Sequence, residues 1–399
     1  MIFAFDHEVM IYAVPTLDDR DREVIEGIEQ YRSQLRHFIG RPRRWQGLIR
    51  RNLRARAMRG SNSIEGYDVS LDDALAILED DEEALTADQR TVLEVTGYRN
   101  AMTYVQQLAD DPDFSLDQSL LRGLHFMMLG HDLDKSPGSY RRGAVYVRDD
   151  EAEEIVYEGP DADLVPSLMR ELVEQLEALL SDPGCPIFVA AAMAHLNLVM
   201  IHPFRDGNGR MARCLQTLML SRNQVLGQEF SSIEEWLGRN TFDYYEVLAK
   251  TGQGKWNPGN DATAWLRFNL MAHHMQAQTV WHRVQEADEL WMKLEALATD
   301  RGFPDRSVQA LYTGALGLRV RRIAYEEATG LEYATAGRDL RNLASAGLLL
   351  AKGETRGRYY MGSAELREIY GEVRAAHRGQ IVDPYKTPPL DDQADDPLF

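Results

Sequence analysis

Cysteine is nearly absent from this 399-residue sequence, which contains only Cys185 and Cys214. The two cysteines lie in unlike contexts without metal-ligand spacing, so we expect a reducing compartment and no structural zinc. Long apolar runs are missing too, because no stretch reaches the about 18 apolar residues that a membrane span needs. Asp6 and Glu8 interrupt the first fifteen residues, which also lack the basic start of a targeting signal. The sequence therefore predicts a cytoplasmic protein that does not span a membrane.

Positive charge is the scarcer sign, with 44 Lys and Arg against 63 Asp and Glu and a net charge of −19. This balance argues against nucleic acid as the main ligand of the whole surface. Residues 31–60 are the exception, since they hold ten arginines and no acidic residue. The stripe is either a basic helix on acidic neighbours within residues 72–83, which we favour, or an anion or nucleic-acid patch.

Strong β patterns are scarce, and helical periodicity dominates, which predicts a mainly α fold. An apolar helix is expected over residues 187–199, just after Pro186, and another over 209–221, after a glycine-rich turn. Glycines bracket a run of β-formers at residues 138–147, which predicts a small hairpin. A second hairpin is expected over 348–360 with its turn at 353–357. Residues 383–399 hold four prolines and five aspartates and predict a disordered tail.

Residues 202–213, HPFRDGNGRMAR, join the two central helices and carry the most chemistry. A turn with two glycines before a helix points several backbone N–H groups one way, and the helix adds its positive end, which suits phosphates. Arg210 and Arg213 lie three residues apart and could bind the outer phosphates bidentately. Asp206 offers a carboxylate oxygen to Mg²⁺. His202, with an ordinary pKa of about 6.5, suits a general base acting on a hydroxyl.

This segment resembles the signature of the Fic family, HPFxDGNGRxxR, at every fixed position. The alternative, a glycine-rich turn with incidental charges, explains only the glycines. The resemblance implies that His202 is the base, that Asp206 binds Mg²⁺ and that Asn208 and the glycine amides hold the α-phosphate of ATP. Arg210 and Arg213 would hold the β- and γ-phosphates. The implied nucleotide-binding set comprises Phe204, Asp206, Gly207, Asn208, Gly209, Arg210 and Arg213, with Tyr244 and Tyr245 on the adenine side.

The resemblance extends over about residues 115–275. Residues 137–147 look like the family's flap, a hairpin that aligns the target by strand addition. It implies a target-facing set of Tyr140, Val145, Tyr146 and Val147. Trp256 and Trp265 resemble residues near the adenine, and ordinary core packing explains them equally well.

An upstream segment, Ser61 to Gly66, fits the family's inhibitory pattern, Ser/Thr-x-x-x-Glu-Gly/Asn. By itself it would be a helix end with Gly66 after the last turn. Together with the signature it implies that Glu65 pairs with Arg213 and denies that arginine to the γ-phosphate. The inhibitory residues are then Ser61, Glu65 and Gly66.

Residues 305–375 have a pattern of their own: a short helix, a turn, a second helix and a basic hairpin. They resemble the bacterial winged-helix modules that are often attached to Fic domains. Residues 301–369 carry 11 Lys and Arg against 8 Asp and Glu. DNA binding, protein binding and packing within the molecule all remain open for this module, because a DNA reader usually has a stronger basic footprint.

These patterns divide the chain into five parts: an N-terminal helical region (1–114), a Fic catalytic core (115–275), a linker helix (276–304), the winged helix (305–375) and an acidic tail (376–399). The resemblance implies a protein adenylyltransferase that moves AMP from ATP to a Ser, Thr or Tyr hydroxyl of another protein or of itself. Another nucleotide, removal of AMP, or DNA-bound regulation by a nucleotide-sensing core are the alternatives, and family members often form homodimers. The isolated histidines, His125, His195, His273 and His274, are expected to be structural.

Overall fold

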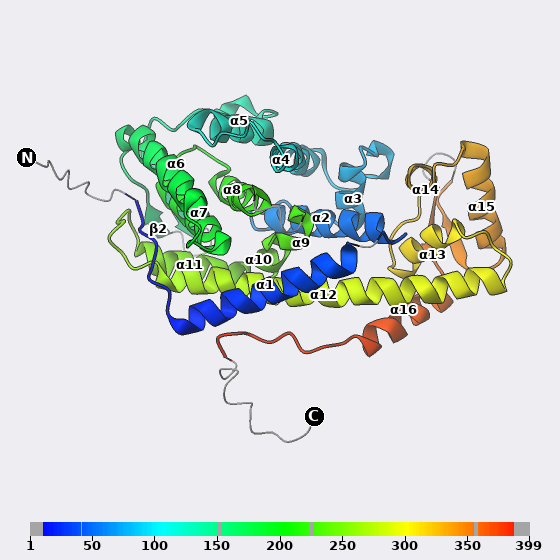
Figure 1. The fold of residues 1–399 in the computed structure, drawn as a ribbon. Helices are drawn as coiled ribbons and strands as arrows, with labels where there is room; N and C mark the ends of the chain where they lie inside the picture. The colour runs from blue at the N-terminus through cyan, green and yellow to red at the C-terminus, as the bar shows by residue number, and fades with distance from the viewer. Residues whose placement is uncertain (1–10, 41, 150–153, 223–226, 355–357, 387–399) are drawn as a thin grey trace, which may run out of the picture.

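The computed structural model describes residues 11–40, 42–149, 154–222, 227–354 and 358–386. Helices form most of these residues, and the strands described belong to two short antiparallel hairpins (Figure 1). The expected mainly α fold is confirmed. None of the helices in the described ranges combines the length and apolar character that crossing a bilayer demands.

The N-terminal region is a set of helices with polar residues at their starts. Asp18 and Asp21 form a reciprocal capping box at the first helix, and Ser70 and Asp88 accept backbone N–H groups at the third and fourth. These helices are α1 (Asp19–Ile39), α2 (Gln46–Ser63), α3 (Leu71–Leu78) and α4 (Gln89–Leu108), with a 3₁₀ turn η1 (Glu82–Ala84) before α4.

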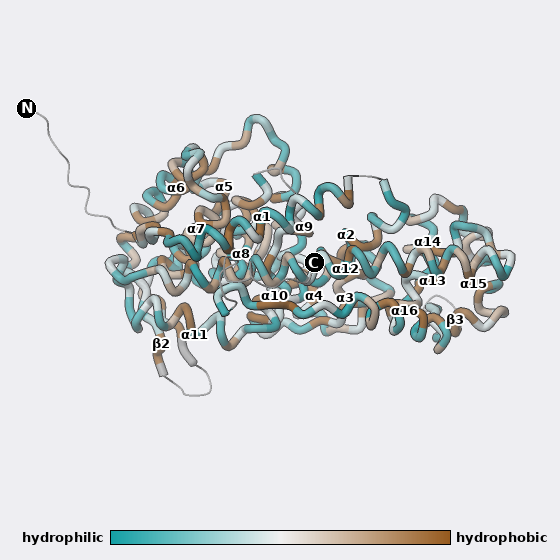
Figure 2. The backbone as a smooth tube through the Cα atoms, turned by 60° about the horizontal axis from the view of Figure 1, so that its bottom comes forward, coloured by the Kyte–Doolittle hydropathy of each residue, from teal (hydrophilic) through white to brown (hydrophobic). Residues whose placement is uncertain are grey.

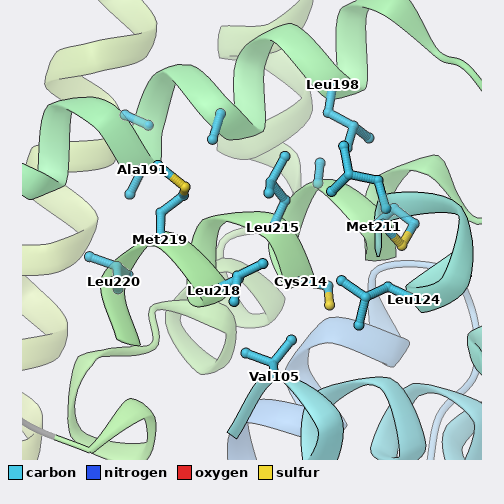
Figure 3. Close-up of a cluster of buried hydrophobic side chains, with 14 of the residues drawn as sticks. Val105, Leu124, Ala191, Leu198, Met211, Cys214, Leu215, Leu218, Met219 and Leu220 are labelled. Carbon is cyan, nitrogen blue, oxygen red and sulfur yellow. The ribbon is translucent and has the colours of Figure 1, made fainter. Parts of the chain in front are cut away.

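The central region is built around one helix that is apolar on all sides and therefore buried, α7 (Ile187–Ile201). It packs against α8 (Asn208–Arg222), where Leu198 and Ala191 of α7 meet Met211, Leu215 and Met219 of α8 (Figure 3). Around this pair lie α5 (Gln118–Leu129), η2 (Leu133–Lys135), β1 (Tyr146–Asp149), β2 (Glu154–Glu158), η3 (Ala162–Leu164), α6 (Val165–Ser181), α9 (Gln228–Ser231), α10 (Glu234–Arg239) and α11 (Thr241–Gly252).

One long helix, α12 (Thr263–Asp300), connects this core with the C-terminal module (Figure 1). Leu266 and Leu270 near its start belong to the central hydrophobic cluster, whereas Val280 and Leu294 belong to a second cluster with the C-terminal helices. The module contains α13 (Ser307–Ala315), α14 (Arg322–Thr329), α15 (Tyr333–Ser345), β3 (Leu349–Lys352), β4 (Tyr359–Gly362) and α16 (Ala364–Ala376). Its assignment as a winged helix stays a prediction.

In Figure 2 the apolar stretches of α7 and α8 lie among the surrounding helices. Along α12, polar and apolar stretches alternate. The arginine stripe of residues 31–60 is largely paired within the fold. Arg51 contacts Glu79 at 2.7 Å, as we expected, but Arg43 pairs with Asp288 of α12 at 3.0 Å and Arg56 with Glu235 of α10 at 3.7 Å. Its partners therefore come more from α10 and α12 than from residues 72–83.

The first hairpin lies further along the chain than predicted. Its strands pair Tyr146 with Glu158 and Val147 with Tyr157, so the prediction of a hairpin within residues 138–147 was wrong. Residues 138–145 form a loop instead, because the buried Arg141 side chain donates to the carbonyls of Gly143, Pro160 and His202 and draws this segment onto α7. Only the β-formers at the end of the run are left to pair with β2.

The second hairpin agrees with the prediction, pairing Leu349–Lys352 with Tyr359–Gly362. Residues 355–357 of its predicted turn lie outside the described residues. The tail differs in part, because Val382 exchanges two hydrogen bonds with the side chain of Gln278 and the Tyr385 hydroxyl donates to Asp21. Residues 377–386 therefore lie against α12 and α1, and residues 387–399 lie outside the described residues.

Candidate active site

His202 begins the turn between α7 and α8 in an unusual backbone conformation, with φ of 51°. Its N–H donates to Leu198, and its ring Nδ1 lies 3.1 Å from the Val199 carbonyl oxygen. A carbonyl can only accept, so Nδ1 carries the proton and Nε2 is left as the unprotonated acceptor. Burial lowers the pKa of His202 to about 4. At neutral pH the ring is therefore neutral and able to accept a proton through Nε2.

The turn itself is held by side chains within the signature. The Asn208 side chain accepts the Phe204 N–H through Oδ1 and donates to the Phe204 carbonyl through Nδ2, both at 2.9 Å. These two hydrogen bonds join the end of the turn to its beginning. Phe204 is fully buried and stacks on His125 with ring centroids 3.7 Å apart. The expected roles of Asn208 and Phe204 in nucleotide binding remain predictions, and their side chains stabilise the turn.

His125 fixes the turn from α5. Its Nδ1 accepts the Gly138 N–H at 2.8 Å, so its Nε2 carries the proton and donates to the Asp206 carbonyl at 2.9 Å. Burial lowers the pKa of His125 to about 4, which keeps this hydrogen-bonding tautomer neutral. Gly207, next in the turn, has φ of +76°, and a Cβ there would meet Leu129 at 2.8 Å. The position therefore favours glycine on both counts.

The two arginines of the signature are almost completely buried at the start of α8. Arg210 pairs with Glu94 of α4 at 2.8 Å, and the same carboxylate accepts from Lys135 at 2.5 Å. Burial opposes the charge on Glu94, but Lys135 and Arg210 outweigh it and lower its pKa to about 2. Glu94 thus holds two cations beside the turn.

Asp206 is the half-exposed carboxylate of the turn. One oxygen accepts the Gly207 N–H at 2.6 Å and the other lies 2.9 Å from Lys135. Burial would raise its pKa, but Lys135 and the Gly207 N–H lower it, so the carboxylate is charged at neutral pH. Among the described residues no group of three or more His, Cys, Asp or Glu side chains could hold a metal ion. Mg²⁺ commonly takes one or two carboxylates plus phosphate and water oxygens, and Asp206 fits that pattern.

Arg213 is held by the end of α2. Its Nε donates to the Ser61 hydroxyl at 2.8 Å, and its Nη2 donates to the Ser61 carbonyl at 2.9 Å and to Glu65 at 2.6 Å. The buried Nη1 has no partner in the described part of the chain. A Cβ added to Gly209 would lie 2.3 Å from the same Glu65 oxygen. The Glu65 carboxylate therefore covers the N-terminal turn of α8, where the helix favours an anion.

The sequence of this region matches a known family model. Residues 115–220 match the model of the Fic/DOC family.

The Fic domain has relatives among known proteins. The chain is 28% identical over 256 residues to the protein adenylyltransferase Fic of Nematostella vectensis, covering 62% of this chain and 54% of that protein. It is 34% identical over 194 residues to the protein of the same name from Aedes aegypti, covering 47% and 35%. The chain thus spans about half or less of the length of these relatives.

Solved structures show the same fold. A Fic family protein from Desulfovibrio desulfuricans G20 superposes with a TM-score of 0.56 at 23% identity, covering 88% of this chain and 98% of that one. A Fic-domain signaling protein from Bacteroides thetaiotaomicron gives a TM-score of 0.50 at 20% identity, over 67% and 98%. At these identities the likeness concerns the fold alone.

The aromatic residues expected near the adenine behave differently from one another. Tyr244 is 1% exposed, and its hydroxyl lies 2.9 Å from His195 inside the core of the Fic domain. Tyr245 is half-exposed and donates to the carbonyl of Ile64, which lies within the predicted inhibitory segment. Trp265 is buried with its indole N–H on Ala192, which is core packing. Tyr245 therefore stays a candidate for nucleotide contact, while Tyr244 lies beneath the site.

Of the four residues expected in the flap, two lie in the hairpin and two lie outside its strands. Tyr146 and Val147 belong to β1, whereas Val145 precedes it and its carbonyl accepts the Gly159 N–H. Tyr140 packs its ring 5.6 Å from Phe204 and lies outside the hairpin. On the far side of β2, its last residue, Glu158, exchanges backbone hydrogen bonds with Gly254 and Trp256. In the described ranges β1 pairs with β2 alone, so its other edge is unpaired.

Sequence reasoning missed three residues that shape the site: Glu94, Lys135 and Arg141. Arg141 donates to the carbonyl of His202 at 2.8 Å, and so ties the loop before the hairpin to the turn. Glu94 and Lys135 lie in other elements, 41 residues apart, and no local pattern links them to the signature. The expectation that the isolated histidines are structural agrees with the contacts of His125 and of His195, which lies between Gln216 and Tyr244.

Proposed function

We propose that this protein is an adenylyltransferase that transfers AMP from ATP to a hydroxyl side chain of a protein. The observation that carries the proposal is the position of a neutral His202, with Nε2 as an acceptor, beside a helix start that has two buried arginines. The relatives' name supports the same reaction. A phosphate site explains why two arginines are buried at this helix start, because their positive charges and the helix N-terminus would bind the same anion.

In this reaction His202 Nε2 takes the proton of the attacking hydroxyl as its oxygen bonds to the α-phosphorus, and the bond to pyrophosphate breaks. The N–H groups at the start of α8 and the side chains of Arg210 and Arg213 bind the phosphates and balance their charge. Mg²⁺, when bound with the nucleotide, would neutralise phosphate charge, and Asp206 is the residue that would hold it. The open edge of β1 would align the target segment by strand addition.

The contact between Glu65 and Arg213 makes the protein self-inhibited in this proposal. The carboxylate pairs with an arginine that the γ-phosphate needs and lies over the same helix start. A hydrogen bond between charged groups contributes about 1.5–3 kcal/mol. Removing this competition is worth about ten- to a hundredfold in rate, since each 1.4 kcal/mol is about tenfold.

We expect Glu65→Gly to raise automodification with labelled ATP by about ten- to a hundredfold, and adding His202→Ala to abolish it. Asp68→Gly is the matched control, because it removes an exposed carboxylate three residues away and should leave the labelling unchanged. Mass spectrometry of the labelled Glu65→Gly protein would identify both the transferred group and the accepting residue. If Glu65→Gly labels as weakly as the wild type, the inhibitory contact is not what limits transfer.

A second candidate function, DNA binding by the C-terminal module, rests on the surface of α15. Arg338, Arg341 and Asn342 are exposed on this helix. We expect Arg338→Glu with Arg341→Glu to abolish a salt-dependent mobility shift on duplex DNA. Arg170→Glu with Arg367→Glu, which changes the charge equally on α6 and α16, should preserve it. Absence of any shift by the wild type at low salt would leave packing within the molecule or protein binding as the role of this module.

A further inference from the structure

A cavity of about 820 Å³ lies apart from the Fic signature, at the junction of the core and the C-terminal module. Residues of α2, α10, α12 and α16 line it, together with the segment that follows α16. In Figure 1, α16 lies along the second half of α12. None of the candidate active-site residues is among its lining residues. The volume is within the range of about 300–1,000 Å³ that is usual for small-molecule sites.

Positive charge gathers in this cavity although the chain as a whole carries −19. Five arginines line it: Arg56, Arg239, Arg283, Arg374 and Arg378. One carboxylate, Glu286, is also in the lining, and Glu235, which is not in the lining, pairs with three of these arginines. A cluster of guanidiniums with planar, forked donors is the arrangement that binds phosphate bidentately.

The carboxylates do not balance these arginines. Glu235 alone is shared by Arg239 at 2.6 Å, Arg283 at 2.8 Å and Arg56 at 3.7 Å. Arg374 and Arg378 are exposed and form no ion pair within the described ranges. Burial, then the neighbouring charge of Arg283, lowers the pKa of Arg56, which means that its charge is incompletely compensated.

We propose that this cavity is a binding site for a small, multiply charged phosphate anion, either inorganic pyrophosphate or the polyphosphate of a nucleotide. A partly open site formed by four separate elements suits a compact ligand. A long nucleic acid would also be repelled by the net charge of −19 on the whole chain. The proposal is independent of AMP transfer, because none of the residues assigned to that reaction takes part.

The same contacts connect the site with the inhibitory segment. Arg56 lies on α2, the helix that ends just before Glu65, and Arg239 lies at the end of α10. These helices touch through their backbones, since a Cβ on Gly60 would lie 2.4 Å from the Glu234 carbonyl oxygen. A ligand on Arg56 and Arg239 therefore contacts both helices of this crossing.

Equilibrium dialysis of the full chain with radiolabelled pyrophosphate tests the proposal. We expect Arg374→Glu and Arg378→Glu each to weaken binding by about tenfold or more, because each adds a negative charge and removes a positive one. Both side chains are exposed, and circular dichroism would verify that the variants fold. Arg170→Glu makes the same change of charge on α6, outside the cavity, and should alter the affinity by less than about twofold.

A second arm with labelled ADP distinguishes the two sources of the phosphate. Tighter binding of ADP than of pyrophosphate, with the same loss in Arg374→Glu, indicates a nucleotide, and the reverse order indicates the inorganic ion. If both cavity variants bind pyrophosphate as the wild type does, the proposal is overturned. Binding of sulfate as strongly as pyrophosphate would mean an adventitious ion only and would overturn it as well.

Discussion

His202 has a left-handed backbone conformation that residues other than glycine rarely adopt. Residues with such strain cost about 1–3 kcal/mol and persist where the surrounding structure over-determines them. Here Arg141 bonds the His202 carbonyl, Leu198 accepts its N–H, and the ring bonds Val199. These contacts fix both the direction of the ring and the nitrogen that can accept a proton.

The pH dependence of transfer follows from the lowered pKa of His202. In the proposed transfer the neutral ring is the active form, so a pKa of about 4 means that the rate rises with pH through about 4 and is level near neutrality. We expect kcat/KM of the Glu65→Gly variant to change by less than about twofold between about pH 6 and 8. An ordinary histidine would instead lose half of its activity near about pH 6.5.

Steady-state kinetics of the Glu65→Gly variant with a hydroxyl-bearing target peptide at several pH values would measure this dependence of kcat/KM on pH. Circular dichroism at each pH would separate loss of activity from unfolding. A half-maximal rate near pH 6.5, with the protein folded, would contradict a base with a lowered pKa.

At the scale of elements, the crossing of α2 and α10 decides where the inhibitory segment lies. Gly60 of α2 faces Gly238 of α10, and a Cβ on Gly238 would lie 2.7 Å from the Gly60 Cα. Two helices can approach so closely only where neither has a side chain. Ser61 and Glu65 follow directly, so this contact sets their position over Arg213.

Gly60→Ala therefore tests the crossing. The new methyl group would overlap the Glu234 carbonyl, and overpacking of this kind costs about 1–3 kcal/mol. We expect urea unfolding to show a loss of stability in this range, accompanied by increased automodification as Glu65 is displaced.

Gly47→Ala, in the first turn of the same helix, is the matched control. A Cβ at Gly47 meets nothing within 4 Å. The change should stabilise the protein by up to about 1 kcal/mol through helix propensity and leave labelling unaltered. Equal effects of the two substitutions would refute a tight crossing at Gly60.

At the scale of the whole molecule, α12 joins two of the hydrophobic clusters, to which α1 and α2 also contribute. Its first half packs with the Fic domain and its second half with α13 and α16. Because one uninterrupted helix contributes to both cores, the described parts of the chain should unfold together.

Thr279→Pro breaks this connection between the two halves. Proline in a helix interior costs about 3 kcal/mol or more and removes a backbone hydrogen bond. We expect calorimetry to show one transition for the wild type and for Thr279→Ala, but two for Thr279→Pro. A single transition in the proline variant would mean that contacts outside α12 couple the halves.

The sequence by itself predicted the chemistry and determined much of the secondary structure. The spacing of residues 202–213 is local, so it predicts a turn between two helices, which the structure has, and a set of phosphate-binding residues, without the fold. The apolar helix after Pro186 and the second hairpin were predicted for the same reason. The first hairpin was misplaced, because the buried bonds of Arg141 hold residues 138–145 as a loop.

Only the tertiary structure decided which distant groups meet at that turn. Glu94 and Lys135 reach Arg210 and Asp206 from separate elements, and Tyr244 turns inward to His195. The segment around Glu65 could be suspected from its pattern, but its contact with Arg213 spans 148 residues and depends on the crossing of α2 and α10. Ion pairs and burial of this kind join residues that no spacing along the chain relates, since packing alone brings them together.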